Sequence, residues 1–319
     1  MTYQRLINIT LVLVYALVIL GGATRAFEAG TSCPDWPHCY GVWWPWPESV
    51  VPGGYVVNGV HYVWGQVALE WVHRLVAMVV GVGLVGMVGY SFMRPRREWL
   101  PLGVAMGLLV VQGALGGVTV LKANAPWSVA IHLGTAMLFF AALLWLRRVV
   151  AAGDKAKALV IAKPVKVYVW ALAALIFVLM LVGGFVSSSY AGGVCGGLFS
   201  CGGDWFPADM QQHSHMMHRY LALAVVVASG AYISLAKRRA SALKPAAVAL
   251  HGMVWGQVAL GILTLYSFAN YAGYYELLSV AHLAWGTLVF VVAVGNILLM
   301  YYGTAGRAHA PAPVKKRRK

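Results

Sequence analysis

Charged residues are scarce in this sequence, and acidic residues are the scarcest of all. Only 10% of the 319 residues are charged, and just nine are Asp or Glu. Soluble domains usually contain about a quarter charged residues, so this chain has too few to cover a water-facing surface. Hydrophobic residues make up 61% of it, with a mean hydropathy of +0.73. These values place most of the chain in lipid.

The few acidic residues do not balance the basic ones, which leaves a net charge of +15. Such an excess can mark a nucleic-acid-binding protein, but the positions of the charges argue otherwise. Of the 24 Lys and Arg, 20 lie near the N-terminus, in three connections (94–97, 147–166 and 237–244) and in the tail from 307. They alternate with segments nearly free of Lys and Arg, which is the positive-inside pattern of membrane proteins. We therefore predict no nucleic-acid partner and a cytoplasmic location for these segments.

Long apolar runs separate the basic segments, and one bilayer span needs about 20 such residues. The runs predict an all-α integral membrane protein with eight transmembrane helices and both termini in the cytoplasm. The predicted helices lie near 6–24, 68–92, 100–121, 128–146, 167–188, 214–236, 246–268 and 277–302. We interpret the first run as a span and not as a cleaved signal peptide, because seven further spans follow it and it has a counterpart later in the chain.

An internal repeat divides the chain into two halves. Glu70-Trp-Val-His73-Arg74 recurs as His215-Met-Met-His218-Arg219, and Gln112-Gly-Ala-Leu-Gly116 recurs as Gln257-Val-Ala-Leu-Gly261, each 145 residues later. His132 recurs as His282 after 150 residues, whereas Gly21-Gly22 recurs as Gly183-Gly184, and Cys33/Cys39 as Cys195/Cys201, after 162. The first outer connection therefore has 17 extra residues, which we predict around 41–58.

The repeat predicts two pseudo-symmetric four-helix bundles. They occupy residues 1–150 and 167–304, with a cytoplasmic linker at 151–166 and a basic cytoplasmic tail at 305–319. Each half has an even number of spans, so both halves have the same orientation. An axis along the membrane normal would relate them.

Four of the ten histidines obey the repeat, namely His73, His132, His218 and His282. Each is predicted about five residues inside a helix that starts at the outer face, which is about 7 Å below that end. The second and fourth helices of a bundle can face each other across its core, so the two histidines of each half can bind a flat ligand from opposite sides. This arrangement predicts bis-imidazole haem ligation twice.

Other roles for these histidines are a helix-to-helix hydrogen bond or a different metal. The hydrogen bond is the ordinary role of one intramembrane histidine, but two matched pairs at one depth favour ligation. Zinc is a poor alternative because neither half supplies a matching carboxylate or Cys. Copper stays open on the histidines alone.

The two halves differ at one position that bears on chemistry. Glu70 lies three residues before His73, one turn away on the same helix face, but its counterpart His215 is not an acid. Of the nine acidic residues, only Glu70 is placed to face a bundle at the depth of the histidines. A carboxylate there can act as a general acid or base, while a favourable charge near a helix N-terminus is the alternative. We predict that Glu70, His73 and His132 form the catalytic site.

Three arginines are candidates for cofactor binding. Arg74 and Arg219 each follow a predicted ligand, and an Arg near the outer surface can pair with a haem propionate. Arg25, at the outer end of the first helix, is a weaker candidate, since its counterpart Ser187 is neutral. Snorkelling to lipid headgroups is the alternative for these side chains.

The four cysteines form two pairs with five residues between their members, Cys33/Cys39 and Cys195/Cys201. Both pairs are predicted at the oxidising face of the membrane, where two disulfides closing short loops are the simplest interpretation. A redox-active or substrate-transfer thiol pair is the alternative. The Cys-x-x-Cys-His motif that attaches haem covalently is absent.

Together these motifs resemble the haem A synthase family of the CtaA and Cox15 type. The resemblance rests on Gly21-Gly22-Ala-Thr-Arg25, Cys33-Pro-Asp-Trp-Pro-His-Cys39 and Glu70-Trp-Val-His73-Arg74. It covers essentially the whole chain, and the Cys loop followed by Glu-x-x-His-Arg is highly specific. The departures, a Trp- and Pro-rich stretch at 43–47 and a Gly-rich second Cys loop, concern loop conformation.

The resemblance implies a reaction in which the C8 methyl group of haem O is oxidised through hydroxylated intermediates to the formyl group of haem A, used by terminal oxidases. It implies that the N-terminal half, with Glu70, His73 and His132, holds the substrate haem O. The C-terminal half, with His218 and His282, would hold haem b as cofactor. Implied partners are haem O synthase, cytochrome oxidase and an electron acceptor of unknown kind. We expect the protein in the plasma membrane, with its active sites toward the outer face.

Two other functions stay open at this point. A di-haem b electron-transfer subunit would explain the four histidines equally well. It would explain neither the Glu70/His215 difference nor the Cys-Pro-Asp-Trp-Pro-His-Cys loop. A haem carrier would bind haem and leave its mass unchanged.

Overall fold

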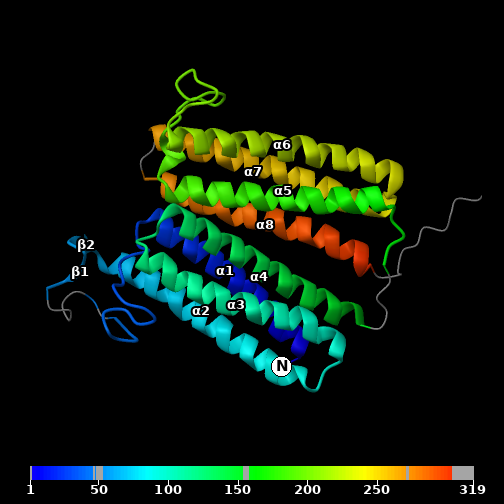
Figure 1. Cartoon of the computed structure of the whole chain (residues 1–319), viewed down its shortest axis with the longest axis horizontal. Coiled ribbons are helices and arrows are strands. Elements are labelled where there is room, and N and C mark those ends of the chain that lie inside the picture. The colour runs from blue at the N-terminus through cyan, green and yellow to red at the C-terminus, as the bar shows by residue number, and fades with distance from the viewer. Residues whose placement is uncertain (1, 46, 48–52, 154–157, 271–272, 304–319) are drawn as a thin grey trace, which may run out of the picture.

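A computed structural model describes residues 2–45, 47, 53–153, 158–270 and 273–303 (Figure 1). Within these residues the chain forms eight long helices and one small hairpin. The helices are α1 (Tyr3–Ala26), α2 (Trp64–Ser91), α3 (Trp99–Leu121), α4 (Pro126–Ala152), α5 (Lys163–Ser188), α6 (Met210–Arg239), α7 (Lys244–Asn270) and α8 (Tyr275–Tyr301), and the strands are β1 (Tyr55–Val57) and β2 (Val60–Tyr62). Short 3₁₀ turns stand at Arg96–Glu98, Ala191–Gly193 and Ser241–Leu243.

All eight helices are long and apolar enough to cross a membrane. The shortest, α3, has 23 residues and the longest, α6, has 30, which is about 35–45 Å at a rise of about 1.5 Å per residue. A hydrocarbon core of about 30 Å is therefore spanned with helix to spare. The prediction of an all-α membrane protein with eight spans is confirmed.

Most of the predicted helices were too short, and the largest differences lie around the connection between α4 and α5. Helix α4 continues to Ala152 instead of ending at 146, and α5 begins at Lys163 instead of 167. Arg147 and Arg148 lower the hydropathy but are good helix formers, so the helix continues past the apolar run. The linker predicted at 151–166 thus shortens to 153–162, of which 154–157 lie outside the described residues, as does the predicted basic tail at 305–319.

The helices group as α1–α4 and α5–α8, one set beside the other in Figure 1. Each set has its own hydrophobic core. Leu84, Leu143 and Leu146 belong to the core of the first set, and Leu172 and Leu250 to that of the second. The sets meet where α1 contacts α8 and α4 contacts α5, with α4 and α8 the most buried helices. The exact division into 1–150 and 167–304, and the symmetry axis, stay predictions.

The connections with clusters of basic residues lie at one end of the bundle. Helix α1 begins there and α8 ends there, together with the α2–α3 and α6–α7 turns (Figure 1). The opposite end, here called the outer end, carries the two cysteine-containing loops and the hairpin. Four helix starts face the outer end, those of α2, α4, α6 and α8, so these four place their early residues at similar depth.

The hairpin lies in the first outer connection, where irregular extra residues were predicted. Strand β1 pairs with β2 in antiparallel register, with Tyr55 opposite Tyr62 and Val57 opposite Val60. Asn58 and Gly59 form the turn with φ of 51° and 80°. Two consecutive positive φ angles are what a type I′ turn requires, and Asn-Gly is its preferred sequence.

Candidate functional site

The four histidines of the repeat lie on the four helices that start at the outer end. They are six to nine residues inside α2, α4, α6 and α8, or about 9–14 Å along the axis. The prediction of five residues and about 7 Å was too shallow, because the helices begin two to four residues earlier than expected. The shared depth of the four remains.

His218 and His282 face each other within the second set of helices. Their ring centroids are 6.3 Å apart and their ring planes are inclined by 71°. Two imidazoles on opposite sides of one iron, each about 2 Å from the metal, have ring centres roughly 6–6.5 Å apart. The observed spacing therefore fits bis-imidazole ligation of one haem iron.

His73 on α2 and His132 on α4 are the equivalent residues of the first set of helices, by the internal repeat. Within the described residues, no group of three or more His, Cys, Asp or Glu is placed to hold a metal ion. Two facing imidazoles without a third protein ligand suit a metal that brings its own equatorial donors. Haem iron is such a metal.

A glutamine approaches the second histidine of each pair. The amide Nε2 of Gln112 lies 3.1 Å from Nε2 of His132, and that of Gln257 lies 3.0 Å from Nε2 of His282. The two glutamines are 145 residues apart and belong to the repeat. The repeated Gln was visible in the sequence, but only the fold shows that its partner is the histidine of the next helix.

Glu70 is buried, with 4% of its surface exposed. Its carboxylate occupies a polar position between Arg74 and the first cysteine loop, here called the seat. One carboxylate oxygen accepts hydrogen bonds from the Ser32 hydroxyl and the Cys33 backbone N–H, both at 2.9 Å. The other is 2.6 Å from the Arg74 guanidinium. The sequence did not point to Ser32, whose role depends on the fold of the loop before α2. These three donors hold a charged carboxylate in one position.

The same seat in the second set of helices holds His215, which is also buried. Its Nε2 lies 3.2 Å from the Arg219 guanidinium, so Arg219 contacts the residue four positions earlier, as Arg74 does. Of the two seats, only the first holds a carboxylate. The predicted asymmetry is therefore present in space as well as in sequence.

Arg74 and Arg219 also fix the two cysteine loops. Arg74 donates to the carbonyls of Asp35, at 2.5 Å, and of His38, with a longer contact to Cys33 at 3.5 Å. Arg219 donates in the same way to the carbonyls of Gly197, Leu198 and Cys195. The described contacts of both arginines are thus to protein groups, and propionate binding stays a prediction.

Both predicted disulfides are formed, Cys33–Cys39 and Cys195–Cys201. In each loop the second cysteine makes a backbone bridge to the residue three positions later, Cys39 with Val42 and Cys201 with Asp204. The Trp-rich stretch after the first loop packs on α2, where the Trp71 indole donates to the carbonyl of Trp43 at 2.7 Å. Trp71 directly follows Glu70 in the sequence.

Arg25 lies between the two sets of helices at the outer end. Its guanidinium donates to the carbonyl of Ser187, its predicted counterpart, and lies 4.1 Å above the Tyr190 ring. It therefore joins α1 to α5. A role of Arg25 in binding the cofactor stays a prediction.

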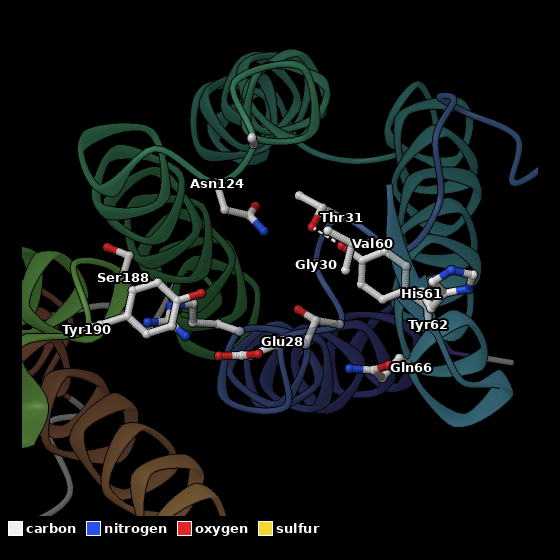
Figure 2. Close-up of a pocket in the computed structure, with 13 residues that line it drawn as sticks. Glu28, Gly30, Thr31, Val60, His61, Tyr62, Gln66, Asn124, Ser188 and Tyr190 are labelled. Atoms are coloured by element: carbon white, nitrogen blue, oxygen red, sulfur yellow. Dashed lines mark hydrogen bonds between the residues drawn. The ribbon is translucent and has the colours of Figure 1, made fainter. Parts of the chain in front are cut away.

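A cavity of about 320 Å³ opens beside Arg25 at the outer end of α1–α4 (Figure 2). Its wall comes from the end of α1, strand β2, the start of α2, the α3–α4 turn and the end of α5. Glu28, Thr31 and Asn124 present polar groups toward it (Figure 2). None of the four repeated histidines lines it, because they lie deeper. The cavity is a polar hollow at the outer end of the first set of helices.

The histidines outside the repeat were predicted to be loop or helix-end residues: His38, His61, His213, His251 and His309. His38 and His61 lie in the first outer connection, and His213 lies in the first turn of α6. His251 differs, since it lies seven residues inside α7 and bonds to Ser229 and Trp255. His309 lies outside the described residues.

A family described as cytochrome oxidase assembly protein, COX15-CtaA, matches residues 4–294 of this chain. The chain belongs to this family. The match covers all of α1 to α7 and most of α8, so it includes the four histidines, Glu70 and both cysteine loops. The family resemblance predicted from the motifs is confirmed.

Several relatives named Heme A synthase are also similar to this chain. The protein from Shewanella oneidensis is 30% identical over 295 residues, which cover 81% of this chain and 86% of the relative. The protein from Methylorubrum extorquens is 32% identical over 303 residues, covering 80% and 76%. That from Rhizobium rhizogenes is 30% identical over 329 residues, covering 90% and 86%. The similarity therefore extends over both sets of helices.

Proposed function

We propose that this chain is a haem A synthase, which oxidises the C8 methyl group of haem O to the formyl group of haem A. The observation that carries the proposal is the buried Glu70–Arg74 pair, which stands beside one of two histidine pairs and has no acidic counterpart beside the other. A simple electron carrier has no use for that carboxylate. The names of the similar proteins support the same function.

Haem O is the substrate of the N-terminal half in this proposal. His73 and His132 hold its iron, which fixes the porphyrin between α2 and α4. Replacing two hydrogens of a methyl group by one oxygen removes four electrons and requires protons to leave. Glu70 accepts and passes on protons, and the Ser32 hydroxyl links its carboxylate to the outer loop. This assignment makes the reaction that of an oxidoreductase acting on a C–H group.

The C-terminal half holds haem b in this proposal, through His218 and His282. A haem b held there would supply one-electron redox chemistry. Arg219 fixes the second cysteine loop at the outer end of the same set of helices by donating to the Cys195 carbonyl. The 6.3 Å spacing of the two imidazoles supports this assignment.

The protein is a multi-pass membrane protein, and we place it in the plasma membrane with both termini in the cytoplasm. The basic connections 94–97 and 237–244 lie at the end of the bundle opposite the cysteine loops (Figure 1), which supports this orientation. Both haem sites then lie toward the outer face. A haem O synthase is the expected supplier of the substrate, and a cytochrome oxidase is the expected user of the product.

Haem analysis tests the proposal directly. Haem is extracted from cells that make haem O, with and without this protein, and its mass is measured. Haem A, or its hydroxylated precursor, is expected only in cells with the protein. Unchanged haem O in cells whose purified protein carries reducible haem would support the electron-transfer subunit or the haem carrier instead.

A variant pair tests the role of Glu70. Glu70→Gln keeps the size of the side chain but cannot take up a proton, so the conversion of haem O is expected to fall about 100-fold or more. Glu276→Gln is the control, because Glu276 also lies near the start of a helix that begins at the outer end, on α8. Wild-type conversion by Glu70→Gln would show that the carboxylate is not catalytic.

A further inference from the structure

Each of the four repeated histidines packs its imidazole against a glycine of the neighbouring helix. A Cβ atom placed on the glycine would lie 3.1 Å from Cε1 of His73 at Gly21, 3.4 Å from Cε1 of His132 at Gly116, 2.9 Å from Cε1 of His218 at Gly183 and 3.0 Å from Cε1 of His282 at Gly261. At Gly21, Gly183 and Gly261 a side chain would fit only if the imidazole moved, whereas the contact at Gly116 is an ordinary van der Waals one. Three of the rings therefore pack on a helix backbone more closely than a residue with a Cβ atom would ordinarily allow.

The rings share an orientation as well as a neighbour. At Gly21, Gly183 and Gly261 the Nδ1 atom of the imidazole is nearer to the glycine than Nε2 is, at 3.3–3.6 Å against 3.8–3.9 Å. Cε1 is the ring atom closest to each of these glycines, and Nδ1 lies slightly nearer to the glycine-bearing helix than Nε2 does. Nε2 is the nitrogen that we take as the iron ligand, and in His132 and His282 an iron there would displace the contact with the Gln112 or Gln257 amide.

A backbone carbonyl lies beside three of the four rings, always four residues before the glycine. These carbonyls are Leu17 for His73, Leu179 for His218 and Gln257 for His282. These contacts do not have the geometry of hydrogen bonds, and the buried Nδ1 atoms have no hydrogen-bond partner among the described residues. A small ring movement would complete them.

The physical reason for the glycine follows from helix geometry. The carbonyl of a residue points toward the residue four positions later, and a Cβ there would shield it from a neighbouring side chain. Glycine at that position exposes the carbonyl to Nδ1–H. A histidine that binds a metal through Nε2 normally donates its Nδ1–H to such a carbonyl, which fixes the tautomer and makes the ring a stronger donor to the metal.

We propose that Gly21, Gly116, Gly183 and Gly261 are positioning residues that orient the four haem-ligating imidazoles, and that at Gly21, Gly183 and Gly261 the carbonyl four residues earlier is the Nδ1–H acceptor. The proposal rests on the proposed function, because it takes these histidines as haem ligands. The His132 seat is the loosest, with the longest distance to its glycine and no carbonyl contact of this kind.

The abundance of glycine does not explain these contacts. Several other glycines within membrane-spanning helices would meet no atom within 4 Å if they carried a Cβ, among them Gly81, Gly86, Gly103, Gly107, Gly113 and Gly252. A fifth histidine, His251, does lie 3.4 Å from a Cβ built on Gly230. Its Nδ1 already has a partner in the Ser229 hydroxyl, whereas the Nδ1 atoms of the four repeated histidines have no hydrogen-bond partner among the described residues.

The test compares three single variants of the haem-loaded protein: Gly183→Ala and Gly261→Ala at the haem b histidines, and Gly252→Ala as control. Gly252 lies on α7, the same helix as Gly261, so helix propensity changes equally. The readouts are the low-spin electron paramagnetic resonance signal and the midpoint potential of haem b, neither of which requires turnover. Loss of the Nδ1–H contact weakens the imidazole as a donor, so the two seat variants are expected to shift the signal and raise the potential. A signal and potential equal to those of Gly252→Ala would overturn the proposal.

A variant in the other half guards against a general folding defect. Gly21→Ala is expected to lower the amount of haem O retained at His73 and to leave the haem b spectrum unchanged. If it perturbs haem b as strongly as Gly183→Ala does, the glycines act on packing in general and the proposal fails. A wild-type protein that purifies without any haem would instead refute the proposed function.

Discussion

At the scale of single residues, the difference between the two halves lies in one polar seat. Arg74 and Arg219 make the same kinds of contact with loop carbonyls, yet the seat between each arginine and its loop holds Glu70 in one half and His215 in the other. The loop can therefore be fixed without a carboxylate. This argues that Glu70 is present for chemistry and not merely to hold the loop.

Removal of Arg74 should destabilise the protein, because it leaves the buried charge of Glu70 without its partner. Arg74→Met is expected to lower the free energy of unfolding by about 3 kcal/mol, as for other broken buried ion pairs. Thermal unfolding of the detergent-purified protein measures the change. Arg74→Met combined with Glu70→Gln should be more stable than the sum of the two single effects predicts, because the double variant buries no unpaired charge. Strictly additive effects would show that the pair is not coupled.

At the scale of elements, the first cysteine loop contacts Glu70 and the second contacts Arg219, so in the proposed function they adjoin the reaction site and the haem b site respectively. The backbone N–H of Cys33 donates to Glu70, whereas the carbonyl of Cys195 accepts from Arg219 beside His215. Each disulfide closes a loop that contributes one of these contacts. The two disulfides should therefore affect different steps.

Removal of each disulfide by paired Cys→Ser substitution tests this division. Loss of Cys33–Cys39 is expected to release the Cys33 N–H from Glu70 and to lower haem O conversion about tenfold, as loss of roughly one hydrogen bond to a charged group would. The haem b spectrum should stay unchanged. Loss of Cys195–Cys201 should reduce the haem b content of the purified protein. Equal effects of both changes on both readouts would contradict the division.

The helices and loops also show which parts of the fold could be predicted from the sequence. Eight spans, the repeat, both disulfides and the shared depth of the histidines followed from apolar runs and spacing, since these patterns are local or periodic. The hairpin at 55–62 was missed although Asn58-Gly59 between Val57 and Val60 is a strong turn signal. The partners of Glu70 were not predictable, because Ser32 and Cys33 reach it only through the loop's tertiary fold.

At the scale of the whole molecule, the two Gly-Gly pairs connect the halves. The first glycine of each pair faces the histidine of its own half, and the second faces a leucine of the other half. A Cβ on Gly22 of α1 would lie 2.4 Å from Cδ2 of Leu283 on α8, next to His282, and one on Gly184 of α5 would lie 3.0 Å from Cδ2 of Leu133 on α4, next to His132. The second histidine-bearing helix of each half, α4 or α8, is thus packed against the glycine pair of the opposite half.

Gly22→Ala tests this connection between the halves. The added methyl group must displace Leu283, whose end can rotate only within a packed interface, so a loss of about 1–2 kcal/mol in stability is expected. Gly86→Ala on α2, where a Cβ meets no atom within 4 Å, should be neutral or slightly stabilising. Because Leu283 follows His282, Gly22→Ala should also alter the haem b signal, although Gly22 belongs to the other half. Adding Leu283→Ala should restore part of that signal by making room for the methyl group. An unaltered haem b signal in Gly22→Ala, together with a loss of stability, would show that the halves are packed together without influencing each other's haem site.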